Sequence, residues 1–371
     1  MARYDENPHS NAVLRSRLSC INLTVIELES KLEALRGEQS EIAALLDDIV
    51  YPVLSVPPEI KLRIFAFASA SPVLGNAEDY RELDSGPLLL AGVCRDWRQL
   101  VCGAPELWST LRIVQERKRS NTRQLVEAVE LWLLRSAARP LQLSFSSQHV
   151  NRSRLAPALA SCAPRICSLD WEVDFDATID EALKGRLGKL QYLGISAGSR
   201  WTAFESAPQL THAKVLLWTR NPQLPWSQIK YLQLSFATRD PDAILRFLLT
   251  TTAVETLAAD DNHVSLLLPT LATEASSPGV LPNLKHLIVR YSVRDFQYLW
   301  NPKSSLDFLL LKEFLDVRLE PQGHEAAKIR SLEIVLLSHE ECTEEIHLAK
   351  EMLAKGGFAE KGLKIRVASG R

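Results

Sequence analysis

The stretches VPPEIKLRIF (residues 56–65) and VCRDWRQLV (residues 93–101) carry apolar side chains on more than one helical face. Pro57 suits the first turn of a helix, because a proline lacks a backbone donor that this turn would leave unused. Glu59 then lies in the first turn, where a negative charge favours the helix dipole. We therefore expect two short helices, one in each stretch.

The apolar side chains follow at helical spacing in the first helix and form two stripes in the second. They are Ile60, Ile64, Phe67 and Ala68 in the first helix, Leu89, Val93, Trp97 and Leu100 in the second, and Leu90, Cys94 and Val101 on its other face. A unit of roughly 45 residues cannot bury two apolar faces by itself. One face must meet something else, which predicts a docking module; a helical hairpin inside a larger core is the alternative.

The same residues carry a resemblance to a known family. In order, Pro57, Glu59-Ile60, Ile64-Phe65 and Val93-Cys94-Arg95-x-Trp97-Arg98-x-Leu100 resemble an F-box, and the likeness is closest to the F-box families of mushroom-forming fungi. The segment PELWSTL (residues 105–111) resembles the connection from an F-box into a leucine-rich-repeat domain. The likeness is strongest over residues 54–113. Val56 departs from the usual leucine, and residues 71–87 insert a polar loop.

The resemblance implies a substrate receptor of an SCF-type (Skp–cullin–F-box) ubiquitin ligase. Such a receptor would bind a Skp-family adaptor, and through it a cullin, and would capture a protein substrate whose identity the sequence does not name. The residues that the resemblance assigns to adaptor binding are Pro57, Ile60, Ile64, Leu89, Val93, Cys94 and Trp97. A scaffold that binds the adaptor without a ligase role is the alternative.

The amino-acid composition limits the classes of binding partner that we expect. The 371 residues include 43 Lys and Arg against 45 Asp and Glu, so we expect neither nucleic acid nor a membrane as a partner. We find no signal peptide and no apolar run of spanning length. The six cysteines are scattered without CxxC pairs, which is typical of reduced thiols. These features predict a cytoplasmic or nuclear protein.

The N-terminal region shows a heptad repeat. Its apolar positions are Leu14, Ile21, Leu28, Leu35 and Ile42, together with Leu18, Val25, Leu32 and Leu46, and only Gln39 is polar. This pattern predicts a coiled-coil helix over residues 14–50. A parallel homodimer would place Lys31 against Arg36 of the other chain, so an antiparallel pairing, a different partner, or packing onto the docking module remain open.

After residue 110 a weak LxxLxL pattern recurs, starting at Ile166, Leu190, Leu210, Ile229, Val254, Leu284 and Ile329. We expect an α/β leucine-rich-repeat-like solenoid, with a generic α/β sandwich as the alternative. The predicted fold is thus mixed α and β: a coiled-coil helix, an all-α F-box-like module, then the solenoid. The predicted domains are a disordered N-terminus (1–13), the helix (14–50), the module (51–107) and a substrate-recognition domain (108–371).

The third residue of each LxxLxL unit should face away from the core. These residues are Ser168, Tyr192, His212, Tyr231, Thr256, His286 and Ser331. Tyr192, His212, Tyr231 and His286 are the candidate substrate-binding residues, because exposed aromatic and imidazole groups on a rigid sheet suit protein recognition. Cross-strand stacking without any ligand explains the same pattern.

Two motifs suggest catalysis or metal binding, and neither is adopted. Gly194-Ile195-Ser196-Ala197-Gly198 spells the GxSxG of a hydrolase, but Ile195 should fill an inward strand position, which places Ser196 along a strand rather than in the required turn. His339, Cys342 and His347 lie close together without a further ligand set. We therefore predict a protein that is not an enzyme, with no cofactor and no metal; a serine hydrolase using Ser196 is the remaining alternative.

Overall fold

The computed structural model describes most of the chain in two compact units, Met1–Lys61 and Leu62–Arg371. The described residues are 11–47, 52–69, 72–76, 86–115, 122–146, 152–172, 176–196, 201–217, 223–236, 240–260, 264–273, 279–293, 296, 306–319, 328–337 and 342–370. The predicted domain boundaries stay a prediction.

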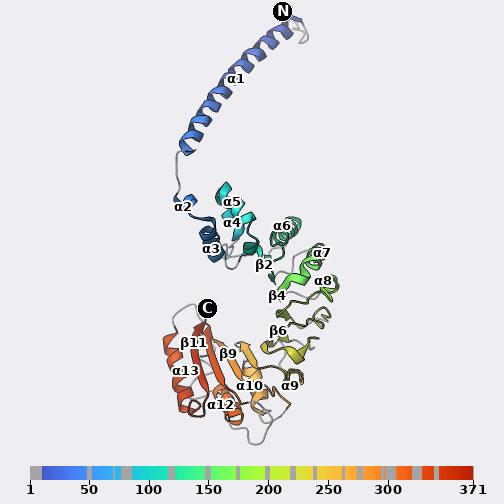
Figure 1. Cartoon of the computed structure of the whole chain (residues 1–371), viewed down its shortest axis with the longest axis vertical. Coiled ribbons are helices and arrows are strands. Elements are labelled where there is room, and N and C mark those ends of the chain that lie inside the picture. Colours follow the sequence, from blue (N-terminus) through green and yellow to red (C-terminus); the bar gives the residue numbers. More distant parts are fainter. Residues whose placement is uncertain are drawn as a thin grey trace, which may run out of the picture. The chain divides into compact units, whose positions relative to one another are not determined.

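The first unit is dominated by one long helix, α1 (Asn11–Asp47) (Figure 1). It contains the whole predicted heptad and continues through Gly37 without a break. Residues 11–13, predicted to be disordered, are its first turn, and the rest of that segment lies outside the described residues. A short helix, α2 (Pro52–Ser55), follows.

Both quoted stretches are helical, but the second contains a break. Helix α3 (Pro58–Ala68) has Glu59 in its first turn, as predicted. Helices α4 (Pro87–Val93) and α5 (Arg95–Cys102) are separated by Cys94, whose φ of −154° and ψ of 174° are extended. The predicted stripe from Leu89 to Leu100 is therefore divided between two helices. A 3₁₀ turn, Pro105–Trp108, leads from α5 into the sheet.

Among the residues that the structure describes, eleven parallel strands form one sheet in the order of the sequence. They are β1 (Val73–Asn76), β2 (Thr110–Gln115), β3 (Leu141–Phe145), β4 (Ile166–Trp171), β5 (Tyr192–Ser196), β6 (His212–Leu217), β7 (Tyr231–Phe236), β8 (Thr256–Asp260), β9 (His286–Ser292), β10 (Ser331–Leu337) and β11 (Lys364–Gly370).

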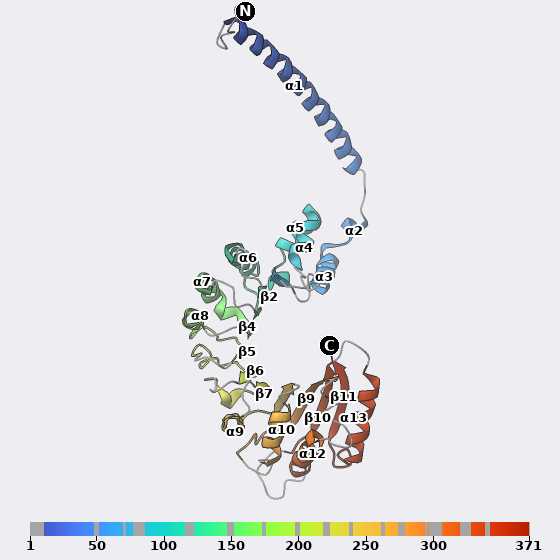
Figure 2. The ribbon, with the colours of Figure 1, turned by 180° about the vertical axis from the view of Figure 1, so that it is seen from behind.

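Helices lie between many of these strands in the sequence. They are α6 (Thr122–Arg135), α7 (Arg152–Cys162), α8 (Ala177–Leu183), α9 (Pro241–Leu248), α10 (Val264–Thr273), α12 (Leu306–Leu319) and α13 (Thr343–Lys355). Helices α6, α7 and α8 follow one another along the same side of the strands in both views (Figures 1 and 2).

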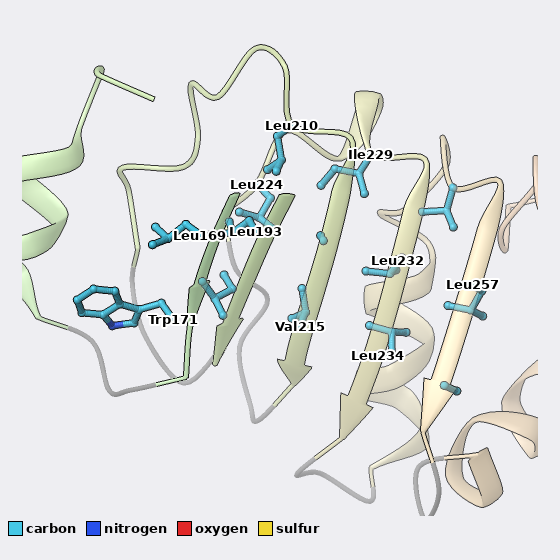
Figure 3. Close-up of a cluster of buried hydrophobic side chains, with 14 of the residues drawn as sticks. Leu169, Trp171, Leu193, Leu210, Val215, Leu224, Ile229, Leu232, Leu234 and Leu257 are labelled. Carbon is cyan, nitrogen blue, oxygen red and sulfur yellow. The ribbon is translucent and has the colours of Figure 1, made fainter. Parts of the chain in front are cut away.

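Alternation along each strand builds the core, because successive side chains point to opposite faces. Leu169, Leu193, Leu232 and Leu257, from β4, β5, β7 and β8, are each at most 1% exposed and lie in one buried row (Figure 3). The helices cover this face of the sheet. Consequently the alternate strand residues remain available on the other face.

Trp108 connects helix α5 with helix α6, which follows the second strand. Its Nε1 donates to the carbonyl oxygen of Val101 at 2.9 Å, and its ring meets Trp132 edge-on with 4.8 Å between ring centroids. The Arg135 guanidinium lies 4.6 Å from the centroid of the same ring. Helix α5 and helix α6 are thus tied to one buried tryptophan.

The predicted fold class is wrong. Residues 51–107 are not an all-α module, because β1 lies inside them and pairs in parallel with β2. The strands then continue as one all-parallel sheet with helices between them, an α/β architecture, instead of a separate leucine-rich-repeat-like solenoid. The LxxLxL pattern indicates a strand with one buried face, and this parallel sheet contains such strands without being a separate solenoid.

Within the described part of the chain, none of the helices combines the length and the apolar character that crossing a membrane requires.

Candidate functional site

Exposed apolar side chains gather on two of the short helices. We call Ile64 and Phe67 of α3 with Leu88, Leu89 and Val93 of α4 the apolar helical surface. Phe67 is 89% exposed, Val93 61%, Leu89 60% and Ile64 56%. These five make up more than half of the exposed large apolar side chains among the described residues from 62 onward; the others are Leu131, Leu134, Leu249 and Leu309. Exposed apolar side chains in this number on two neighbouring segments of a folded unit make the set a candidate interaction surface.

The opposite side of the same helices is packed. Phe65 is 2% exposed, and its ring lies against Trp97 with 4.7 Å between centroids. Arg98 Nε donates to the carbonyl oxygen of Ala91 at 2.8 Å, which holds α5 against α4. Gly86 begins α4 with a φ of +41° and lies so close to Pro72 that a Cβ would be 3.0 Å from the proline Cβ. Helices α3 and α4, which carry the apolar helical surface, are therefore held by packed contacts on their other side.

The adaptor-binding residues taken from the resemblance divide into two groups. Pro57, Ile60, Ile64, Leu89 and Val93 are exposed, with Ile60 at 44%. Cys94 and Trp97 are half-buried, and Trp97 packs against the core. Phe67 and Leu88 were not assigned, although the spacing of three from Ile64 to Phe67 on one helix is the signal that identifies the phenylalanine. Adaptor binding by the seven assigned residues stays a prediction.

The free face of the sheet carries a second candidate surface. The strand register aligns Ser168, Tyr192, His212, Tyr231, Thr256, His286 and Ser331, each opposite the next across neighbouring strands. We call this set the sheet row. The register confirms the predicted alignment, whereas a role in substrate binding stays a prediction.

Tyr231, in the middle of the sheet row, has an aromatic neighbour and a charged neighbour. His212 stacks on Tyr231 with 5.4 Å between ring centroids and 26° between planes. Arg290 Nη2 donates to the Tyr231 hydroxyl at 3.4 Å, and Arg290 Nη1 pairs with Asp260 Oδ1 at 3.0 Å. The other Asp260 oxygen accepts from Gln233 Nε2 at 2.6 Å. Tyr231 is consequently held in place on a rigid sheet.

His286 stands apart from the other three candidate substrate-binding residues. Thr256 separates it from Tyr231 in the register, and its Nδ1 lies 2.7 Å from the Ser331 hydroxyl oxygen. The sheet therefore brings Tyr192, His212 and Tyr231 together on consecutive strands and places His286 two strands beyond them.

An acidic group next to Tyr192 was missed by sequence reasoning. Asp170 on β4 lies beside Gly194 of β5, and a Cβ at Gly194 would overlap its carboxylate. The missing side chain lets Asp170 Oδ2 approach Lys214 Nζ of β6 at 3.8 Å, and Lys214 also pairs with Glu172 Oε1 at 3.0 Å. Asp170 Oδ1 is buried and has no hydrogen-bond partner among the described residues.

Burial shapes the protonation of this cluster. It raises the pKa of the Asp170 carboxyl, against the opposing charges of Lys214 and Arg112. Burial, followed by the charge of Asp170, raises the pKa of Tyr192 to about 12. Burial alone would lower the pKa of Lys214, but Asp170 and Glu172 raise it by more. With its pKa at about 12, the Tyr192 phenol is neutral at pH 7 and can donate a hydrogen bond.

A pocket of about 240 Å³ opens beside this cluster. The polar residues in its lining are Thr110, Arg112, Gln142, Ser144, Ser168, Asp170 and Tyr192. Donors and acceptors thus converge where the sheet row begins, with one carboxylate oxygen left unsatisfied by the described residues. This arrangement suits recognition of a polar side chain on a partner protein.

The two chemical motifs of the sequence have the following positions. Ser196 ends β5 and pairs with Leu216, so its backbone is in a strand; its side chain lies outside the described residues. Cys342 is buried and His347 lies in α13, while His339 is not described. No group of three or more His, Cys, Asp or Glu side chains among the described residues could hold a metal ion. Absence of enzymatic activity stays a prediction.

A comparison of the chain with protein-family models and with curated proteins finds no match.

Proposed function

We propose that this chain is a substrate-recognition adaptor of an SCF-type ubiquitin ligase. The apolar helical surface docks on a Skp-family adaptor, which links the chain to a cullin. The free face of the sheet holds a protein substrate, and ubiquitin transfer takes place on other subunits. The protein then acts in the cytoplasm or the nucleus, where that machinery works.

The observation that supports the docking most directly is the exposure of the apolar helical surface. Burying a large apolar side chain contributes about 1.5–3 kcal/mol, so burial of Ile64, Phe67, Leu89 and Val93 would contribute favourably to a complex. The F-box-like residues support a Skp-family adaptor as the partner, since Ile64, Leu89 and Val93 belong to both sets. The polar lining beside Asp170 and the sheet row support the second binding function.

Reconstitution tests the proposal. The purified chain is mixed with a recombinant Skp-family adaptor and its cullin, and the assembly is separated by size-exclusion chromatography. We expect all three proteins to elute together. Co-elution with the adaptor but not the cullin would support the scaffold without a ligase role, and elution of the chain alone would refute the proposal.

A further inference from the structure

Helix α1 exposes an apolar seam that its own unit does not cover. The seam residues are Leu14, Leu18, Ile21, Val25, Leu28, Leu32, Leu35, Ile42 and Leu46, each between 43% and 64% exposed. They occupy a and d positions of the heptad, with Gln39 at the remaining a position. A helix with this seam buries it by pairing with another helix, whose identity the flanking e and g charges select.

We infer that the partner is α1 of a second copy of this chain, running antiparallel, with Leu32 of each copy opposite Leu35 of the other. This register also pairs Ile21 with Leu46, Val25 with Ile42, and Leu28 with Gln39. The overlap spans residues 21–46, close to four heptads. Apart from Gln39, every residue in these layers is apolar.

The charges beside the seam favour this register. In an antiparallel pair the e residues of the two helices face each other, and so do the g residues. Glu29 then meets Arg36 of the second copy, and Lys31 meets Glu38. Each pair occurs twice by symmetry, so four attractive contacts flank the core. Lys31 Nζ also pairs with Glu27 Oε1 of its own helix at 2.7 Å, and its three donors allow both contacts.

Neighbouring registers lack this complementarity. Sliding the helices by one heptad to the longest overlap places Glu29 against Glu29 and Lys31 against Lys31. A further heptad in that direction places Arg15 against Arg36, which offsets the attraction between Arg17 and Glu38. A parallel pair places Lys31 against Arg36 of the second copy. Like charges in these positions oppose association, which leaves the register centred on Leu32 and Leu35.

Disulfide trapping tests orientation and register. Two full-length variants are made in a Cys20→Ser background, one with Ile21→Cys and one with Leu46→Cys. In the inferred register these positions face each other, whereas Ile21 of the two copies are about 37 Å apart at 1.5 Å per residue. We expect a disulfide-linked dimer when the two variants are mixed and oxidised, and none beyond the Cys20→Ser background from either alone. Cross-linking of each variant with itself, or no cross-link in the mixture, would overturn the inference.

A charge exchange gives an independent check. Lys31→Glu places a second carboxylate against Glu38 of the other copy and should weaken the dimer about tenfold, measured by analytical ultracentrifugation of the full chain. Adding Glu38→Lys restores the attraction and should restore the dimer. Both variants lose the Glu27 contact equally. A parallel pair predicts tighter association for Lys31→Glu, and that result, or a monomeric wild-type chain, would contradict the inference. The inference does not depend on the proposed function.

Discussion

Phe65 packs its ring against Trp97 with 4.7 Å between ring centroids, whereas Phe67, two residues later on the same helix, is 89% exposed. One side of α3 therefore belongs to the interior and another is free. Because of this separation, residues of the apolar helical surface can be substituted without disturbing the packing of Phe65 against Trp97. Substitutions in α3 should accordingly fall into two classes.

The first prediction compares the two phenylalanines. Phe65→Ala removes a buried ring and should lower the free energy of unfolding by about 3–5 kcal/mol. Phe67→Ala changes an exposed site and should alter it by less than about 0.5 kcal/mol. Urea unfolding followed by tryptophan fluorescence measures both. Equal losses for the two variants would show that α3 does not have separate packed and free sides.

The second prediction concerns Gly194. Gly194→Ala inserts a methyl group where the Asp170 carboxylate lies and should cost about 1–3 kcal/mol of stability. Asp170→Ala removes the obstacle, so Gly194→Ala should be tolerated much better in that background. A double-mutant cycle by chemical denaturation gives the coupling between the two sites. Additive effects would mean that the carboxylate does not lie over the glycine.

The third prediction is the ionisation of Tyr192. Burial, then the charge of Asp170, raises the pKa of its phenol to about 12, above the usual value near 10. Because the folded-state pKa is raised, the unfolded chain loses this proton first, and the stability that Tyr192 contributes falls between about pH 10 and pH 12. Ultraviolet titration of wild type minus Tyr192→Phe isolates the group. Titration of the difference near pH 10 would exclude a buried phenol beside the carboxylate.

The fourth prediction separates the two binding functions. Tyr192→Ala with Tyr231→Ala should reduce capture of substrate proteins by at least about 30-fold while leaving adaptor binding unchanged, because truncating a single aromatic hot-spot residue costs about 2 kcal/mol or more. Quantitative mass spectrometry of proteins retained from cell extract gives the first value, and the recovered adaptor gives the second. Lys189→Ala, exposed and outside the sheet row, is the matched control. Unchanged capture by the double variant would remove the sheet row from the substrate site.

Strand alternation is the part of the fold that sequence reasoning predicted best. The LxxLxL spacing identified the outward residue of seven strands, so the alignment of Tyr192, His212 and Tyr231 was correct. The overall architecture was not, because a buried strand face has the same pattern in a solenoid and in an α/β sheet. The strand Val73–Asn76 was also missed, since it lies within a segment whose polar residues suggested a loop.

The candidate site was harder to predict for a different reason. The contact between Asp170 and Lys214 crosses an intervening strand and depends on Gly194 having no side chain. Residue spacing in the sequence does not reveal the register between β4 and β5 or the space that Gly194 leaves for the Asp170 carboxylate. In the sequence, Gly194 appeared only as part of a GxSxG motif. Likewise, the sequence spacing places Trp97 in one stripe with Leu89 and Val93. The extended backbone at Cys94 ends α4 before α5 begins, so the stripe is divided between two helices.

Isothermal titration calorimetry with a purified Skp-family adaptor measures whether the apolar helical surface binds that adaptor. The comparison uses wild type, Ile64→Asp with Val93→Asp, and Leu134→Asp, which changes an exposed leucine on α6. Equal unfolding midpoints first establish that all three are folded. We predict that the double variant binds at least about 100-fold more weakly, while Leu134→Asp binds as wild type does. Equal affinity of the adaptor for all three proteins would contradict the account.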